Sequence, residues 1–338
     1  MAKAPRWIAC RVLIAAALCV LARTGAHATP DVVVTLKPLH ALVAAVMEGV
    51  GTPHLLIDSA ASPHTYAMKP SEVRRLNHAD VIVRVSKRLE VFLDKPLSLV
   101  SKESRIVTID EETPGLTLLT LRNGGDFEPH LHDDDASGHV HAHPVHADAH
   151  EAHDHAAHVH TENPTASDPH LWLDPRNAKA IGLHLADVLA EAIPSAAERL
   201  KHNGQALAAR LDRLDSTLAG DLQSVSGRRF LVFHDGYQYF EHRYGLADAG
   251  SVTINPEVPP SARRLSEIRA RLAKANIVCV FAEPQFAPRA IGAIVEGTSV
   301  RQGTLDPLGA SIEAGPTQYF ALMEGLARDL KSCLGGAG

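Results

Sequence analysis

The chain has 338 residues, enough for two domains, and 45% of them are hydrophobic, which is enough to build proper cores. The formal net charge is −6 with histidine neutral, so the sequence carries neither the basic footprint of a nucleic-acid-binding protein nor a polybasic membrane patch. The 21 histidines would make the net charge strongly positive below about pH 6.5.

Residues 1–28 are typical of a secretory signal peptide. Lys3 and Arg6 form a positive n-region, and the apolar stretch 12–21 is too short to span a membrane comfortably. The sequence Ala26-His27-Ala28 then matches an A-x-A cleavage site. We therefore expect an exported protein, with an uncleaved anchor helix as the alternative.

The first half of the mature chain alternates short β-branched runs with helical patterns. This alternation predicts βαβ units around a parallel sheet. Strands are expected at 32–35, 55–57, 81–85 and 106–108, and helices at 39–48 and 70–77.

The run 128–162 holds over half of the histidine in the chain, interleaved with acidic residues. It has almost nothing that could build a core, so we expect a solvated, disordered loop. Imidazole is the commonest protein ligand for zinc, and the run is internal and irregular, unlike a purification tag; it therefore indicates transition-metal handling. Its histidines are His130, His132, His139, His141, His143, His146, His150, His153, His155, His158 and His160.

Two helical stretches follow this run. The first is expected at 175–192, with Asp174 as its cap and Pro175 in its first turn. Pro194 opens the second, whose apolar residues keep helical spacing to about residue 222. At roughly thirty residues it would be about 45 Å long, the size of two domains rather than one.

Strand-helix alternation then restarts, with strands expected at 230–233 and 277–282. The predicted architecture is α/β, with two Rossmann-like lobes that contain parallel sheets and are joined by one long helix. We assign 29–193 to the N-terminal lobe, including the histidine-rich loop, 194–224 to the connecting helix, and 225–338 to the C-terminal lobe. A single larger doubly wound domain is the alternative.

Cysteine usage agrees with export. Cys10 and Cys19 would leave with the signal peptide, so the mature chain keeps only Cys279 and Cys333. Two cysteines in an oxidising compartment predict one disulfide, which would tie the C-terminal tail to a strand of the second lobe. Two buried free thiols are the alternative.

Three histidines outside the run lie in comparable settings. His64 falls between a predicted strand and a helix, His170 just before the helix at 175, and His234 directly after a buried strand. Ligands of open α/β sheets bind at the carboxyl ends of strands, where such loops gather. A cleft between the lobes could therefore place three imidazoles around one ion, although each histidine alone is weak evidence.

The sequences around these histidines resemble a known family. The relevant segments are LKPLH at 36–40, SPHTYAMKPS at 62–71, DPHLWL at 168–173, FHDGYQYF at 233–240, FAEPQF at 281–286 and GTLDPLG at 303–309. They resemble the metal-binding solute-binding proteins of zinc and manganese ABC importers, and most of all the ZnuA-like zinc branch. The resemblance runs in order from about residue 32 to 334, interrupted by the histidine-rich run.

The resemblance implies two lobes joined by a rigid long helix, with the metal held between them. His64, His170 and His234 match the three histidine ligands of the family. The manganese branch places a glutamate at the position of His234, so imidazole there favours zinc. Asp306 is a tentative fourth ligand, with water or a histidine of the loop as alternatives, because Pro63 stands where some zinc members have a glutamate.

We therefore expect a periplasmic, monomeric zinc-capture protein that binds Zn²⁺ as its transported ligand and delivers it to an ABC permease in the inner membrane. Other periplasmic zinc carriers are possible further partners, and the histidine-rich loop would gather metal as an accessory region. No reaction is expected. The alternatives are a manganese-binding homologue, a metal buffer or chaperone acting through the loop, and a zinc hydrolase, which the absence of an H-E-x-x-H motif disfavours.

Overall fold

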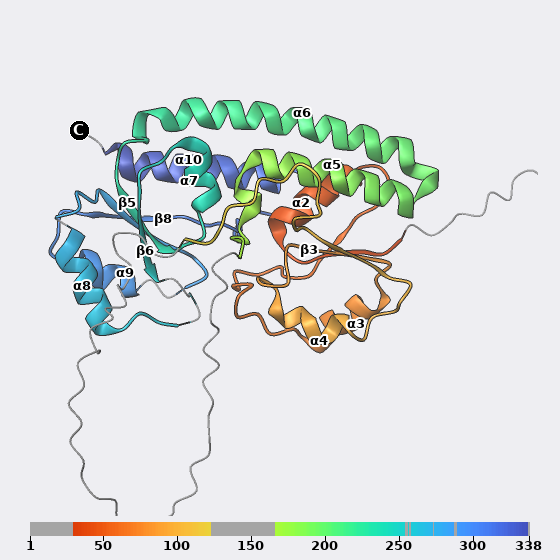
Figure 1. Ribbon diagram of the computed structural model, residues 1–338, viewed down its shortest axis with the longest axis horizontal. Helices are drawn as coiled ribbons and strands as arrows, with labels where there is room; N and C mark the ends of the chain where they lie inside the picture. The colour runs from red at the N-terminus through yellow and green to blue at the C-terminus, as the bar shows by residue number, and fades with distance from the viewer. Residues whose placement is uncertain are drawn as a thin grey trace, which may run out of the picture.

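The computed structural model places two parallel β-sheets side by side, with a layer of long helices across the same side of both (Figure 1). It describes residues 30–122, 166–253, 256, 258–272, 274–286 and 289–336. The proposed signal peptide and the histidine-rich run 128–162 lie outside the described residues. Within the described ranges, no helix is long and apolar enough to cross a membrane.

The first sheet has the strand order β2-β1-β3-β4, and all its pairs are parallel. Its two central strands, β1 and β3, are buried along their whole length, as expected for a sheet covered on both faces. The elements of this lobe are β1 (Val32–Val34), α2 (Lys37–Val46), β2 (His54–Leu55), α3 (Pro70–His78), β3 (Val81–Arg84), η1 (Val91–Leu93), α4 (Asp94–Leu97) and β4 (Arg105–Thr108).

The second sheet repeats this plan with the order β6-β5-β7-β8, again parallel throughout. The buried strand β5 lies between β6 and β7 and ends at His234. The elements are β5 (Phe230–His234), α7 (Gln238–Tyr244), β6 (Asp248–Thr253), α8 (Ala262–Leu272), β7 (Cys279–Ala282), α9 (Arg289–Val295), β8 (Arg301–Thr304) and α10 (Gln318–Gly335). The prediction of two parallel-sheet lobes is therefore confirmed.

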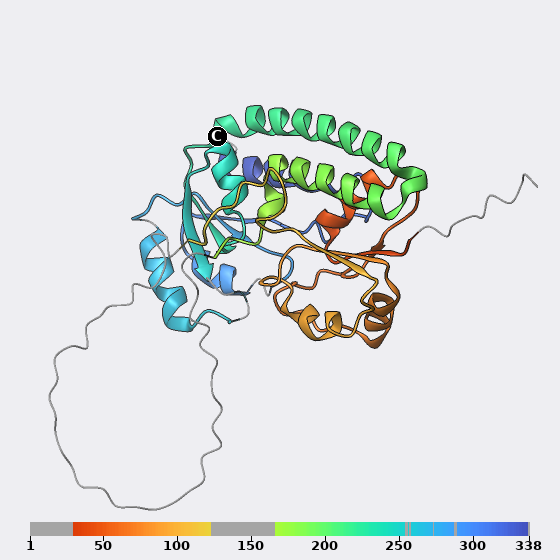
Figure 2. The same ribbon diagram turned by 45° about the vertical axis from the view of Figure 1, so that its right-hand side comes forward.

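Between the sheets in sequence lie η2 (Leu171–Leu173), α5 (Pro175–Ala192), η3 (Pro194–Ala196), α6 (Ala197–Leu222) and η4 (Gln223–Val225). The Asp174 side chain caps α5 by accepting from the Arg176 N–H at 2.8 Å. Helix α6 is the predicted long helix; its 26 residues span about 39 Å, and tighter turns extend it at both ends. It lies over both lobes (Figure 2).

Helices α5 and α6 pack unusually closely because of two glycines. A Cβ atom at Gly204 would lie 2.6 Å from the Cβ of Ala186, and one at Gly182 would lie 2.9 Å from the Leu207 side chain. The buried leucines of α6, including Leu211, recur at helical spacing and face the lobes. The pair of helices therefore forms a stiff backing for both sheets.

One hydrophobic core runs through both lobes. It joins Val34 of the first sheet, Leu211 of α6, Phe281 of the second sheet and Tyr319 of α10. Helix α10, which comes last in the chain, packs against both α2 and α6. Each sheet has a smaller second cluster on its other face. The lobes are thus parts of one packed body rather than two bodies on a flexible tether.

Hydrogen bonds to backbone carbonyls also cross between the lobes. Lys37 Nζ donates to the carbonyls of Ala310 at 2.9 Å and Ile312 at 3.2 Å. Trp172 Nε1 donates to the Pro307 carbonyl at 2.9 Å, and the Tyr319 hydroxyl donates to the Trp172 carbonyl at 2.7 Å. The loop after β8 is therefore attached to the first lobe at several points.

The predicted disulfide is present. It joins Cys279 of β7 to Cys333 of α10, with 6.2 Å between the Cα atoms. It fixes the C-terminal helix to a central strand of the second sheet.

Most element boundaries differ from the sequence prediction by one or two residues, and helix α2 and strand β2 differ at both ends. Helix α2 begins at Lys37 rather than 39, because Pro38 suits a first turn, where its missing N–H costs nothing. It ends at Val46, and Gly49 then adopts a left-handed conformation with φ 72°. Strand β2 is only two residues long, since it pairs with β1 alone at the edge of the sheet.

Candidate metal centre

His64, His170 and His234 meet between the lobes, at the side of the sheets where the strands end. One ligand atom of each lies within 4.8 Å of the others. The Nε2 atom of His170 lies 3.4 Å from that of His64 and 3.3 Å from that of His234. The loop between β2 and α3 supplies His64, the turn into η2 supplies His170, and the end of β5 supplies His234. Three segments separated by 106 and 64 residues thus converge on one point.

A buried carboxylate orients His170. Oδ1 of Asp168 lies 2.8 Å from Nδ1 of the ring and also accepts from the backbone N–H of His170 at 2.9 Å. Asp168 is 1% exposed, so water does not compete for this contact. In the neutral ring the proton therefore sits on Nδ1, and Nε2 presents its lone pair to the other histidines.

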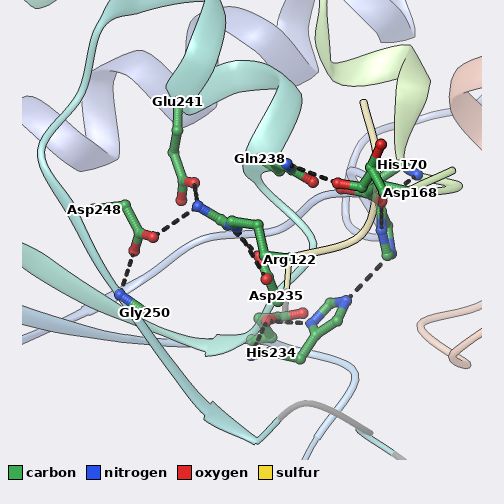
Figure 3. A network of polar contacts seen from close by, with 11 residues as sticks. Arg122, Asp168, His170, His234, Asp235, Gln238, Glu241, Asp248 and Gly250 are labelled. Carbon is green, nitrogen blue, oxygen red and sulfur yellow. Dashed lines mark hydrogen bonds and ion pairs between the residues drawn. The ribbon is translucent and has the colours of Figure 1, made fainter. Parts of the chain in front are cut away.

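Glu283 does the same for His234. Its Oε1 lies 2.6 Å from Nδ1 of His234 and accepts from the backbone N–H at 3.2 Å. Burial lowers the pKa of His234, but the charge and hydrogen bond of Glu283 more than offset this, so the pKa lies above its usual value. Nε2 of His234 consequently faces Nε2 of His170 with its lone pair, as in carboxylate–histidine–metal arrangements (Figure 3).

His64 differs from the other two because it is partly exposed. Within the described part of the chain, its ring makes no hydrogen bond to a carboxylate. Burial, together with the neighbouring His170 and His234, lowers its pKa to about 2. His64 is therefore neutral at any physiological pH, which is the form that binds a metal ion.

Small and apolar residues shape the space beside the three nitrogens. A Cβ atom at Gly236 would lie 2.5 Å from Nε2 of His234 and 3.3 Å from Nε2 of His170, so a side chain there would fill the place of an ion. Trp172, Phe286 and Leu308 line the same small pocket. The pocket thus combines apolar side chains with the imidazoles and a few other polar groups, among them Glu283 and Gln285.

Asp306 does not join this cluster. Its Oδ1 accepts from Gln285 Nε2 at 2.8 Å and from the backbone N–H groups of Leu308 at 3.1 Å and Gly309 at 3.0 Å, while Oδ2 accepts from Ala310 N–H at 2.6 Å. It is also absent from the pocket lining. The carboxylate thus holds the loop that carries Leu308.

The spacing of the nitrogens matches a tetrahedral zinc ion. Zinc–nitrogen bonds are about 2.0–2.1 Å long, which places two ligands of a tetrahedron about 3.3–3.4 Å apart. The two measured separations are 3.3 and 3.4 Å. The Nε2 lone pairs of His170 and His234, whose Nδ1 protons face carboxylates, repel one another at this distance unless a cation lies between them. The arrangement can bind a zinc-like ion and leaves a fourth position open.

Sequence reasoning missed the two carboxylates behind the histidines. The sequence could have indicated Asp168, since it stands two residues before His170 in the DPHLWL segment. It could not have indicated Glu283, because this residue is 49 residues from His234 in sequence and adjacent to it only in the fold. The structure places its Oε1 against Nδ1 of His234. The eleven histidines of the run lie outside the described residues.

Comparisons with known proteins identify close relatives. The family model described as ZnuA, zinc-uptake complex component A, periplasmic, matches residues 32–333. The high-affinity zinc uptake system protein ZnuA of Brucella abortus is 42% identical over 305 residues, which cover 90% of this chain and 91% of that protein. The protein of the same description from Yersinia pestis is 36% identical over 335 residues, covering 97% of this chain and 98% of that one.

Solved structures agree in fold. A crystal structure of ZnuA superposes with a TM-score of 0.70 and covers 91% of this chain and 100% of its own, at 22% identity. The laminin-binding protein of Streptococcus agalactiae, described as an adhesin with metal-transporting activity, superposes with a TM-score of 0.67 at 22% identity and covers 90% of this chain and 100% of its own. At these identities the likeness establishes the two-lobed architecture.

Proposed function

The chain belongs to the ZnuA family, the periplasmic components A of zinc-uptake complexes, and on that basis we propose that it captures Zn²⁺ in the periplasm and delivers it to an ABC permease in the inner membrane. The observation that carries this proposal is the convergence of three imidazoles, with Nε2 of His170 at the edge length of a zinc tetrahedron from the Nε2 atoms of both His64 and His234. The family consists of transport components rather than enzymes, so the ion is cargo and no reaction is assigned.

The proposed ligands are His64, His170 and His234. We assign the fourth position to water, because Asp306 would have to give up four hydrogen bonds to reach the ion. Asp306 and a histidine of the run 128–162 are the alternatives for this fourth position. Three nitrogen donors favour zinc over manganese, which prefers carboxylate and water oxygens.

The signal peptide 1–28 would direct export of the protein to the periplasm. We expect the mature protein to be a monomer there. The run 128–162 would act there as an accessory zone that gathers metal at many weak sites. Other zinc carriers of that compartment are possible partners. A buffer or chaperone that works only through the run is the main rival, since it needs no site between the lobes.

A zinc hydrolase is the weaker rival. Three histidines and an open fourth position do resemble a catalytic zinc site. However, a hydrolase also needs a free base beside the bound water. Glu283, the carboxylate of the pocket lining, is engaged by Nδ1 of His234 at 2.6 Å and serves that ring.

A zinc titration distinguishes a tight site between the lobes from binding by the histidine-rich run 128–162. The mature protein, a variant lacking 128–162 and the His170→Ala variant would be titrated against a chelator of known affinity. We expect one tight site in the first two and its loss in His170→Ala. The matched control is His202→Ala, an exposed histidine on α6, which should bind as the wild type does. Loss of tight binding on removal of the run would refute the cleft site and favour the buffer.

A further inference from the structure

The segment 117–122, here called the strap, crosses from α5 to α7 beside the metal site. At its start, the amide of the buried Asn177 accepts from the Thr117 N–H at 2.8 Å and donates to the Thr117 carbonyl at 2.9 Å. In its middle, the Tyr239 hydroxyl of α7 accepts from the Leu119 N–H and donates to the Asp168 carbonyl, both at 3.0 Å. The strap is thus attached to elements of both lobes.

The strap also pairs with the segment that carries His170. The Asp168 N–H donates to the Leu119 carbonyl at 2.8 Å, and the Leu121 N–H donates to the Ala166 carbonyl at 2.9 Å, on either side of an antiparallel bridge. Since Asp168 in turn holds the ring of His170, any shift of the strap moves this ligand.

Arg122, at the end of the strap, reaches the segment that carries His234. Its guanidinium donates from Nε to Asp235 Oδ2 at 3.0 Å and from Nη2 to Asp235 Oδ1, and its Nη1 lies 2.9 Å from Glu241 Oε2 and 2.8 Å from Asp248 Oδ2. Figure 3 shows the three carboxylates around this one side chain. Asp235 directly follows His234, so the strap ends one residue from a ligand.

The geometry of this position suits an arginine better than a lysine. Glu241 is buried, and burial together with the charge of Asp248 raises its pKa well above the usual value, despite the opposing effect of Arg122. A planar guanidinium can face several carboxylates at once through its fork of N–H groups, whereas a lysine ammonium is a point charge on a flexible stem. The contact therefore depends on the shape of the side chain as well as on its charge.

We propose that Arg122 is a positioning residue for the metal site, which ties the strap to the turn after β5 and so holds His170 and His234 at zinc-binding separation. The chain of contacts runs from His170 through Asp168 to the strap, and from Arg122 through Asp235 to His234. The proposal rests on the proposed function, since it names a determinant of the same zinc site.

A positioning role and a purely electrostatic role of Arg122 predict opposite changes in zinc affinity when this side chain is removed. Loss of a positive charge leaves the neighbouring carboxylates uncompensated, and their field attracts a cation. If Arg122 acted only through charge, Arg122→Gln would bind zinc more tightly. If it positions the histidines, the same variant binds zinc more weakly.

The test compares Arg122→Gln and Arg122→Lys with Arg243→Gln. Arg243 is the matched control. It lies on α7, as Glu241 does, and pairs through two nitrogens with the carboxylate of Asp215. Within the described residues it makes no hydrogen bond to His64, His170 or His234 or to the residues next to them. Zinc affinity would be measured by chelator competition, site geometry by the visible spectrum of bound Co²⁺, and folding by thermal denaturation. Arg122→Lys decides the test if Arg122→Gln fails to fold, because lysine keeps the charge.

We expect about tenfold weaker zinc binding in both Arg122 variants, as for other outer contacts of metal-bound histidines, together with a changed Co²⁺ spectrum. Arg243→Gln should keep the wild-type affinity and spectrum. Wild-type affinity in Arg122→Lys, or tighter binding in Arg122→Gln, would overturn the inference. If instead the wild type has no tight site that His170→Ala removes, the proposed function itself fails.

Discussion

Replacing Glu283 by glutamine tests what the carboxylate behind His234 contributes to zinc binding. Glu283 is 3% exposed, and its Oε1 lies 2.6 Å from Nδ1 of His234, so it both orients the ring and makes Nε2 more basic. Loss of such an outer partner weakens metal affinity about 10- to 100-fold. Glutamine is an isostere whose amide oxygen can still accept a hydrogen bond from Nδ1–H. We therefore expect the lower end of this range, about tenfold weaker zinc binding or about 1.4 kcal/mol.

The same substitution should change the pH dependence. In the wild type the pKa of His234 is raised, and protonated His234 cannot bind zinc, so affinity falls as the pH drops through that raised value. Without the carboxylate charge, burial lowers the pKa, and protons compete only at lower pH. The difference in zinc affinity between the wild type and Glu283→Gln should therefore become smaller as the pH falls from about 8 to about 5.5. His64, with a pKa of about 2, adds no competition in this range.

Chelator competition at a series of pH values measures both effects. The control is Glu267→Gln on α8, an exposed carboxylate whose partner is Arg263, and it should leave zinc affinity unchanged at every pH. Wild-type affinity of Glu283→Gln at about pH 8, or a gap that stays constant as the pH falls, would refute the reasoning about the charge of Glu283.

Three further predictions concern stability. Gly204→Ala should lower the melting temperature although alanine favours helix by about 1 kcal/mol, because the new Cβ would lie 2.6 Å from the Cβ of Ala186; adding Ala186→Gly should restore it. Reducing the Cys279–Cys333 disulfide, which links residues 54 apart, should cost about 4 kcal/mol in denaturant unfolding, and an unchanged midpoint would contradict this. Zinc at about 100 times its dissociation constant should stabilise the protein by about 2.7 kcal/mol in a thermal scan, and chelation or His170→Ala should abolish the gain.

The sequence predicted the fold well because its strongest patterns are long. Parallel strands buried on both faces read as β-branched runs, and the leucines of α6 keep helical spacing over 26 residues. Short edge elements were placed less well. Strand β2 has only two residues and one neighbour, so nothing local in its sequence sets its ends.

The three histidines were found through the segments around them, and their spacing in sequence alone would not have identified them. His64, His170 and His234 lie far apart in sequence, and only the fold brings their nitrogens together. The same holds for Glu283 and for Arg122, whose partners all come from another part of the chain. For Asp306 the resemblance suggested a fourth ligand; in this structure its carboxylate accepts four hydrogen bonds away from the three histidines, and its role as a ligand stays a prediction.

The contacts between the lobes bear on how a bound ion could leave. Opening of the lobes would break the hydrogen bonds that Lys37 and Trp172 donate to carbonyls of the other lobe, at a net cost of about 0.5–1.5 kcal/mol each, because water would replace the lost donors. The shared core would be split as well. His170 and His234 are held by buried carboxylates, whereas His64 is partly exposed and sits in a loop. We therefore expect release of a bound ion to begin with movement of His64 and the loop between β2 and α3, because this movement would break fewer contacts than opening of the lobes.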